Sequence, residues 1–140
     1  MTEKLKAILD TFHALPDREQ KMEYLIELAE QYQAVPNEIS ARPHDKSHLV
    51  PGCESEVYAW CKKNPDNSFK FYYAVENPQG ISAKAFAYIL DQGMSGYPNQ
   101  QIQEISGEIV FEIFGRNMVM GRSQGLTNML MMSKGLANKA

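Results

Sequence analysis

Cysteine is scarce in this 140-residue sequence, which contains only Cys53 and Cys61. Two cysteines cannot supply a four-thiolate zinc site or a disulfide framework. Long apolar runs are also absent, since no segment approaches the roughly 18 consecutive apolar residues of a membrane-spanning helix. The N-terminal segment MTEKLKAILDTFHAL mixes charges with apolar residues, unlike a cleavable signal peptide. We therefore expect a cytoplasmic protein without a membrane partner, whose cysteines are thiols.

Neither sign of charge is in large excess. The sequence has 14 basic and 17 acidic residues, which give a formal charge of -3. This balance argues against nucleic acid or anionic lipid as the main partner, because binding to either requires clustered positive charge. The length fits a single domain over residues 1–140 that can bury a core without metal or disulfide bonds. Proteins and small molecules are the expected partners.

The N-terminal part of the chain predicts two helices followed by an irregular connection. Thr2 is a candidate cap for the first helix, and Asp17 followed by Gln20 marks the start of the second, which we expect to end near Tyr32. Residues 34–48 contain two prolines and no sustained hydrophobic period, which predicts a long irregular loop, and loops of this length often carry function. The second helix is predicted to present one apolar stripe, made of Met22, Leu25, Ile26 and Ala29.

The middle of the chain predicts an antiparallel hairpin. In VYAWC, Val57, Ala59 and Cys61 fall on one face of a strand, while Tyr58 and Trp60 fall on the other. The sequence SFKFYYAV alternates in the same way after an Asn-Pro-Asp-Asn turn. Two alternating segments joined by a turn are typical of paired strands.

The remaining segments predict one more short strand and several helices. Residues 47–50 are a candidate third strand beside the hairpin. A helix is predicted from residue 81 to Gly93, and shorter helices from Pro98 and Ser106. The order of two helices, a small antiparallel sheet and several helices predicts an α+β fold.

Cys53 lies directly after a predicted turn. In the sequence VPGC, Pro51 presets the backbone for a turn and Gly52 tolerates the positive φ that a type II turn requires. A thiol at such a bend can reach another protein or swing inward, whereas a free cysteine elsewhere is often a small buried hydrophobe. We interpret Cys53 as reactive and Cys61, inside the predicted strand, as structural.

Two further groups of residues invite a functional interpretation. Arg122 lies in GRSQG, where it is either a solvated residue beside a capping Ser123 or a cation that stabilises a nearby thiolate. His44 and His48, with Asp45 between them, carry ligand types suited to zinc, but their spacing matches no common zinc signature. We therefore predict no metal site.

Taken together, these features resemble the SufE family, the sulfur-acceptor proteins that work with cysteine desulfurases in iron–sulfur cluster biogenesis. The resemblance rests on VPGCESEVYAW, on RSQGL followed by a methionine-containing helix, and on the length and order of the elements. It covers nearly the whole chain. It implies a fold shared with IscU-type scaffolds, in which helices pack on one side of a small sheet of about three antiparallel strands.

The resemblance also implies a reaction and its partners. Cys53 would take sulfur as a persulfide from a SufS-type, pyridoxal-phosphate-dependent cysteine desulfurase, and a SufB-containing scaffold would receive it. No cofactor would reside in this chain. Arg122 is our candidate for stabilising the thiolate or persulfide. The expected loop and docking residues are Gly52, Glu54, Ser55 and Gln124.

Two alternatives remain open from the sequence. The first is a self-contained thiol redox enzyme that uses Cys53 for peroxide reduction or disulfide exchange. The second is an adaptor that docks on the desulfurase without accepting sulfur. An IscU-type scaffold is disfavoured, because an iron–sulfur cluster needs several thiolate ligands.

Overall fold

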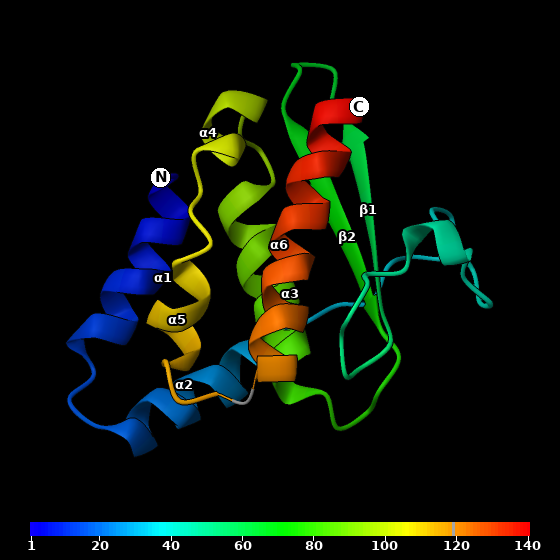
Figure 1. Ribbon diagram of the computed structural model, residues 1–140. Coiled ribbons are helices and arrows are strands. Elements are labelled where there is room, and N and C mark those ends of the chain that lie inside the picture. Colours follow the sequence, from blue (N-terminus) through cyan, green and yellow to red (C-terminus); the bar gives the residue numbers. More distant parts are fainter. Residues whose placement is uncertain (119) are drawn as a thin grey trace.

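A two-stranded antiparallel sheet flanks the helices in the computed structural model, which describes residues 1–118 and 120–140 (Figure 1). β1 spans Val57–Lys63 and β2 spans Phe69–Val75, with the two valines at these strand ends paired. The turn between them contains Asn67 at a φ of 71°, a left-handed conformation that asparagine tolerates better than most residues. The predicted hairpin is confirmed.

The prediction of a third strand over residues 47–50 is wrong. Lys46–His48 form a short 3₁₀ helix, η1, and Leu49 makes only an isolated bridge to Tyr58. The side chain of Asp45 accepts a hydrogen bond from the backbone N–H of Ser47, 2.8 Å away, and so caps a helical turn. The sheet of the described residues therefore has two strands.

Helices α1 (Glu3–Ala14) and α2 (Arg18–Glu30) begin at the predicted caps. The Thr2 hydroxyl accepts from the backbone of the first turn of α1, and Asp17 does the same for α2. α2 ends slightly before the predicted end at Tyr32.

The predicted apolar stripe of α2 is partly wrong. Leu25 and Leu28 are buried, whereas Met22 is 52% exposed and Ile26 is 40% exposed. α2 packs against α3 (Ile81–Met94). Because only a narrow face meets α3, two of the four predicted residues remain outside the core.

The described residues of the C-terminal half form four helices, which are α3, α4 (Asn99–Gln103), α5 (Ile109–Phe114) and α6 (Met120–Lys139). α3 continues past its predicted end at Gly93. Ser123 lies in the first turn of α6, where its hydroxyl donates to the carbonyl of Met120, so the predicted capping role is wrong. Pro98 is the N-cap of α4, and Ser106 accepts a hydrogen bond from the backbone just before α5.

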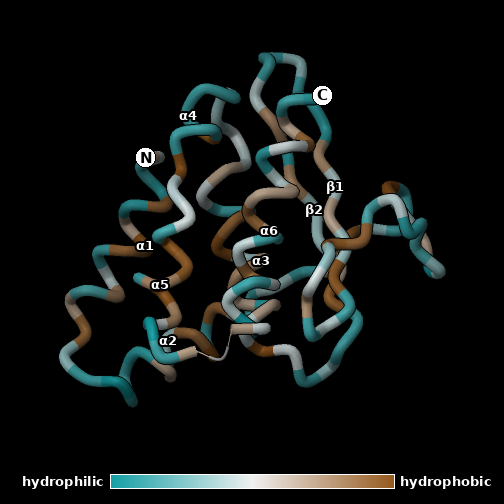
Figure 2. Tube along the Cα trace, viewed as in Figure 1, coloured by the Kyte–Doolittle hydropathy of each residue, from teal (hydrophilic) through white to brown (hydrophobic). Residues whose placement is uncertain are grey.

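The helices lie on one face of the sheet and the loop of residues 34–49 lies on the other (Figure 1). The predicted alternation is confirmed, since Val57 and Ala59 join the main core while Tyr58 and Trp60 pack under the loop. Figure 2 shows the apolar positions of the helices turned toward the interior and polar positions along the outer loops. None of the described helices is both long and apolar enough to cross a membrane.

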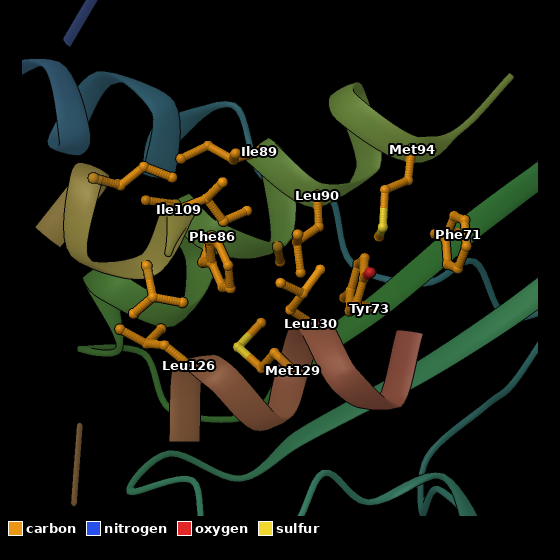
Figure 3. Close-up of a cluster of buried hydrophobic side chains, with 14 of the residues drawn as sticks. Phe71, Tyr73, Phe86, Ile89, Leu90, Met94, Ile109, Leu126, Met129 and Leu130 are labelled. Carbon is orange, nitrogen blue, oxygen red and sulfur yellow. The ribbon is translucent and has the colours of Figure 1, made fainter. Parts of the chain in front are cut away.

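The main core is formed where α3 and α6 meet the sheet. In Figure 3, Tyr73 projects from β2 toward Leu90 of α3 and Leu130 of α6, and Phe71 lies beside Met94 of α3. Each of these side chains is at most 2% exposed. The Tyr73 hydroxyl lies 2.6 Å from the hydroxyl of Ser133 and is thereby satisfied inside the core. This packing fixes α6 against the sheet and so positions the loop that precedes β1.

Candidate functional site

The loop that carries Cys53 joins η1 to β1 and is closed at its base by backbone hydrogen bonds. The N–H of Val50 donates to the carbonyl of Val57 at 2.8 Å, which brings the two ends of the loop together. Gly52 has a φ of 73°, so the predicted requirement for glycine at this turn is met. Cys53 follows this bend and lies at the far end of the loop, as its sequence position indicates.

α6 holds this loop by a side chain that the sequence analysis did not single out. The Nδ2 group of Asn128 donates to the carbonyl of Pro51 at 2.8 Å. The predicted docking residue Gln124 donates through Nε2 to Oδ1 of Asn128 at 3.1 Å. Gln124 therefore contacts the loop only indirectly, through Asn128, which binds the loop itself.

Gly125 of α6 provides the closest approach between helix and loop. The Sγ atom of Cys53 donates to the carbonyl of Gly125 at 3.3 Å. A Cβ at Gly125 would lie 2.9 Å from the Cα of Cys53 and 3.0 Å from the carbonyl oxygen of Gly52. Only glycine allows this approach without displacing backbone atoms. The cysteine is thus turned inward against the helix.

Burial changes the chemistry of this thiol. Cys53 is partly buried and packs against the main core. Desolvation disfavours the charged thiolate and raises the pKa of Cys53 to about 11. At neutral pH the inward side chain is therefore a thiol, whereas the thiolate is the nucleophile in sulfur exchange.

A cavity of about 350 Å³ lies beside the cysteine. Arg122 lines this cavity together with Cys53, and the predicted residues Glu54 and Ser55 line it as well. Arg122 is exposed, and in the described part of the chain it takes part in no ion pair. The structure thus brings the candidate nucleophile and the candidate cation to one cavity.

The N-terminal end of α3 forms another wall of the cavity. Gly80 is its N-cap and supplies no side-chain cap, while Ile81 and Ser82 of the first turn line the cavity. A Cβ at Gly80 would lie 2.8 Å from the Oγ atom of Ser55, so glycine lets the loop approach the helix. Helix N-termini favour negative charge. Arg122 and this end of α3 thus bring positive charge to a cavity that the carboxylate of Glu54 also lines.

The structure also shows which residues the sequence analysis missed. Asn128, Gly125 and Asn77 were not expected to contribute, although Asn77 donates through Nδ2 to Oγ of Ser55 at 3.3 Å. One signal was available for α6. Gly121 and Gly125 lie four residues apart and therefore on one helix face, and both face the loop, since a Cβ at Gly121 would lie 3.5 Å from Oε1 of Glu54.

Cys61 lies in β1, on the face that packs against the main core. It is half-buried, and desolvation raises the pKa of its thiol to about 11. Its position inside a paired strand agrees with the structural interpretation of this residue.

The two histidines of the loop, His44 and His48, contact different residues. The Nδ1 atom of His48 lies 2.9 Å from the carbonyl oxygen of Ala59, whereas His44 contacts Ser40 and Glu76. Among residues 1–118 and 120–140, no group of three histidine, cysteine, aspartate or glutamate side chains is placed to hold a metal ion.

Comparisons with known proteins agree with this arrangement. The family model of SufE, described as an Fe-S metabolism associated domain, matches residues 6–137. The chain is 29% identical over 132 residues to the cysteine desulfuration protein SufE of Plasmodium vivax, and 26% identical over 134 residues to that of Plasmodium falciparum. These matches cover 93% of this chain, which spans about half the length of the two relatives, 51% and 52%.

A solved structure supports the fold independently. The solution structure of a hypothetical protein from Thermus thermophilus superimposes with a TM-score of 0.79 at 23% identity, covering 100% of this chain and 97% of the other. At this identity the likeness concerns the fold alone. Because the family model covers nearly the whole chain, from the first helix to the last, this protein belongs to the SufE family.

Proposed function

We propose that this protein accepts sulfur on Cys53 from a cysteine desulfurase. The Cys53 thiolate attacks the outer sulfur of the desulfurase persulfide. A new S–S bond forms on Cys53, the donor S–S bond breaks, and the donor cysteine leaves as a thiolate. The exchange transfers one sulfur atom without net oxidation. The relatives named as cysteine desulfuration proteins support this choice of reaction.

One observation carries the proposal most directly. Cys53 is at a glycine-containing bend and also borders a cavity that contains Arg122 and the N-terminal end of α3. A bend allows the thiol to leave the cavity and reach a donor. The guanidinium and the helix end then favour the anionic persulfide after its return. The cavity volume of about 350 Å³ leaves room for the added sulfur.

The raised pKa of Cys53 argues against the alternative of a self-contained thiol enzyme. A peroxide-reducing or disulfide-exchanging enzyme needs an accessible thiolate of low pKa in its resting state. Here burial raises the pKa of Cys53 to about 11. The inward position suits a carrier that becomes reactive when a partner draws the loop out.

We further propose two partners. The donor is a SufS-type desulfurase, whose own pyridoxal phosphate performs the carbon–sulfur chemistry, so this chain contributes a thiol and no cofactor. The acceptor is a SufB-containing scaffold. Ile81, which lines the cavity and is 45% exposed, offers an apolar surface for docking, and Met120, two residues before Arg122 in the chain, is 83% exposed.

The test is stimulation of a purified desulfurase with L-cysteine, measured as alanine release. We expect stimulation by the wild type and by Cys61→Ser, and none by Cys53→Ser. Equal stimulation by Cys53→Ser would identify an adaptor instead. Reduction of peroxide by the isolated protein would favour the thiol enzyme.

A further inference from the structure

A second group of interacting polar side chains lies on the opposite side of the sheet, under the loop of residues 34–49. The Oγ atom of Ser40 is 2.7 Å from Nδ1 of His44. The Nε2 atom of the same ring is 3.1 Å from Oε1 of Glu76. A hydroxyl, an imidazole and a carboxylate thus lie in contact in sequence, the same three groups that activate a nucleophilic serine in hydrolases, although the two ring nitrogens are exchanged here: Nδ1 faces the hydroxyl and Nε2 faces the carboxylate.

The charge on Glu76 determines which ring nitrogen carries the proton. Arg42 donates through Nε at 2.9 Å and contacts the same carboxylate through its terminal nitrogen at 2.7 Å. This ion pair lowers the pKa of Glu76, so the carboxylate is ionised at neutral pH and can only accept. Nε2 of a neutral His44 must then donate to Glu76, and its Nδ1 is left to accept the hydroxyl proton of Ser40.

The imidazole is fixed in this orientation by its surroundings. The His44 side chain is only 4% exposed. Its ring centroid lies 5.1 Å from that of Tyr58 and 5.0 Å from that of Trp60. Tight aromatic packing limits rotation of the ring, so the base keeps its position relative to the hydroxyl.

A cavity of about 400 Å³ opens onto all three polar groups. This volume is within the range of small-molecule sites. Tyr32 and Val35 contribute apolar wall. Ala41 and Arg42 also line it, and among the described residues their backbone N–H groups donate to no backbone carbonyl. In serine hydrolases the N–H of the residue after the nucleophile commonly stabilises the oxyanion.

We propose that Ser40 is the nucleophile of a second site, separate from Cys53, that cleaves esters of short-chain carboxylic acids. Ser40 Oγ attacks the carbonyl carbon while His44 Nδ1 takes the hydroxyl proton. The ester C–O bond breaks, the alcohol leaves with that proton, and the acyl group stays on Ser40. Water, deprotonated by His44, then releases the acid and restores the hydroxyl. Glu76 is a positioning residue.

A fluorophosphonate probe tests this site, because it labels activated serines covalently. The protein of residues 1–140 is treated with the probe and the adduct is located by peptide mass spectrometry. We expect one adduct, on Ser40, and its loss in Ser40→Ala. His44→Gln should slow labelling by about 100-fold, the usual contribution of a general base. Ser47→Ala, which removes an exposed hydroxyl of the same loop, should label like the wild type.

Two further measurements test whether labelling of Ser40 depends on the folded site. Wild-type protein unfolded in urea should lose the Ser40 adduct, which shows that labelling depends on the folded site even where a His44 variant is unstable. Hydrolysis of p-nitrophenyl acetate should fall to background in Ser40→Ala. No adduct on Ser40, or an adduct that persists in urea, would mean that the three residues serve only to fasten the loop.

Discussion

The carbonyl oxygen of Gly125 accepts a hydrogen bond from the thiol of Cys53, and the backbones of the two residues lie in direct contact. A residue of the last helix thereby holds the thiol inward. Asn128 adds a second attachment from the same helix. The reactivity of Cys53 consequently depends on how firmly α6 retains the loop.

Gly125→Ala should release the thiol. The added Cβ would lie 2.9 Å from the Cα of Cys53, so the loop must move away. We expect faster alkylation of Cys53 by iodoacetamide at neutral pH, measured by peptide mass spectrometry. Gly135→Ala is the matched control, because a Cβ there would meet no atom of the described residues within 4 Å. Equal alkylation rates in the two variants would contradict a close contact at Gly125.

The alkylation rate of Cys53 should increase with pH far into the alkaline range. Because burial raises the pKa of Cys53 from 9.0 to about 11, the thiolate fraction at pH 7 is lower by about 100-fold than for a solvated thiol. The raised pKa also makes folding depend on pH. Its contribution to the free energy of unfolding is fully present when the pH is below the pKa of the unfolded thiol, and it is lost as the pH increases through 11. Rates measured in Cys61→Ser isolate Cys53. A midpoint near 9.0, the pKa of the unburied thiol, would show that the free protein exposes its thiol.

Arg122→Ala should slow sulfur acceptance without affecting the fold. Loss of one exposed positive charge beside the cavity removes roughly 1 kcal/mol of transition-state stabilisation, which corresponds to about a fivefold decrease in the rate of transfer. Arg122→Lys should retain part of the rate. Arg116→Ala is the control, since this exposed arginine pairs with Glu108. Single-turnover transfer from a loaded desulfurase measures the effect, and identical rates for both alanine variants would exclude Arg122 from the site.

The buried pair Tyr73 and Ser133 should anchor α6 to the sheet. Ser133→Ala removes the hydroxyl that lies 2.6 Å from the Tyr73 hydroxyl and leaves that group buried without this partner. We expect a loss of about 1–3 kcal/mol in the free energy of unfolding, measured by denaturant titration. Adding Tyr73→Phe should recover part of this loss. Additive effects of the two substitutions would indicate that the hydroxyls do not interact.

Local sequence patterns predicted the parts of this fold that depend on near neighbours. The caps at Thr2 and Asp17, the strand alternation from Val57 to Cys61 and the bend at Gly52 are all observed. Each depends on contacts a few residues apart. The family assignment likewise depended on contiguous motifs.

Features that depend on distant residues were not predictable. Burial of Leu28 instead of Ile26 is decided by where α3 crosses α2. The contact of Gly125 with Cys53 joins residues far apart in the chain, so the sequence around either residue does not predict it. His44 was considered only as a metal ligand, because its true partner Glu76 lies beyond the hairpin.

The most direct test of the account is the mass of Cys53 after incubation with a cysteine desulfurase and L-cysteine. We predict a gain of one sulfur atom, located on the peptide that contains Cys53 and removed by a reducing agent. Cys61→Ser should show the same gain. If Cys53 never carries the added sulfur while the desulfurase itself is loaded, this protein is not a sulfur acceptor.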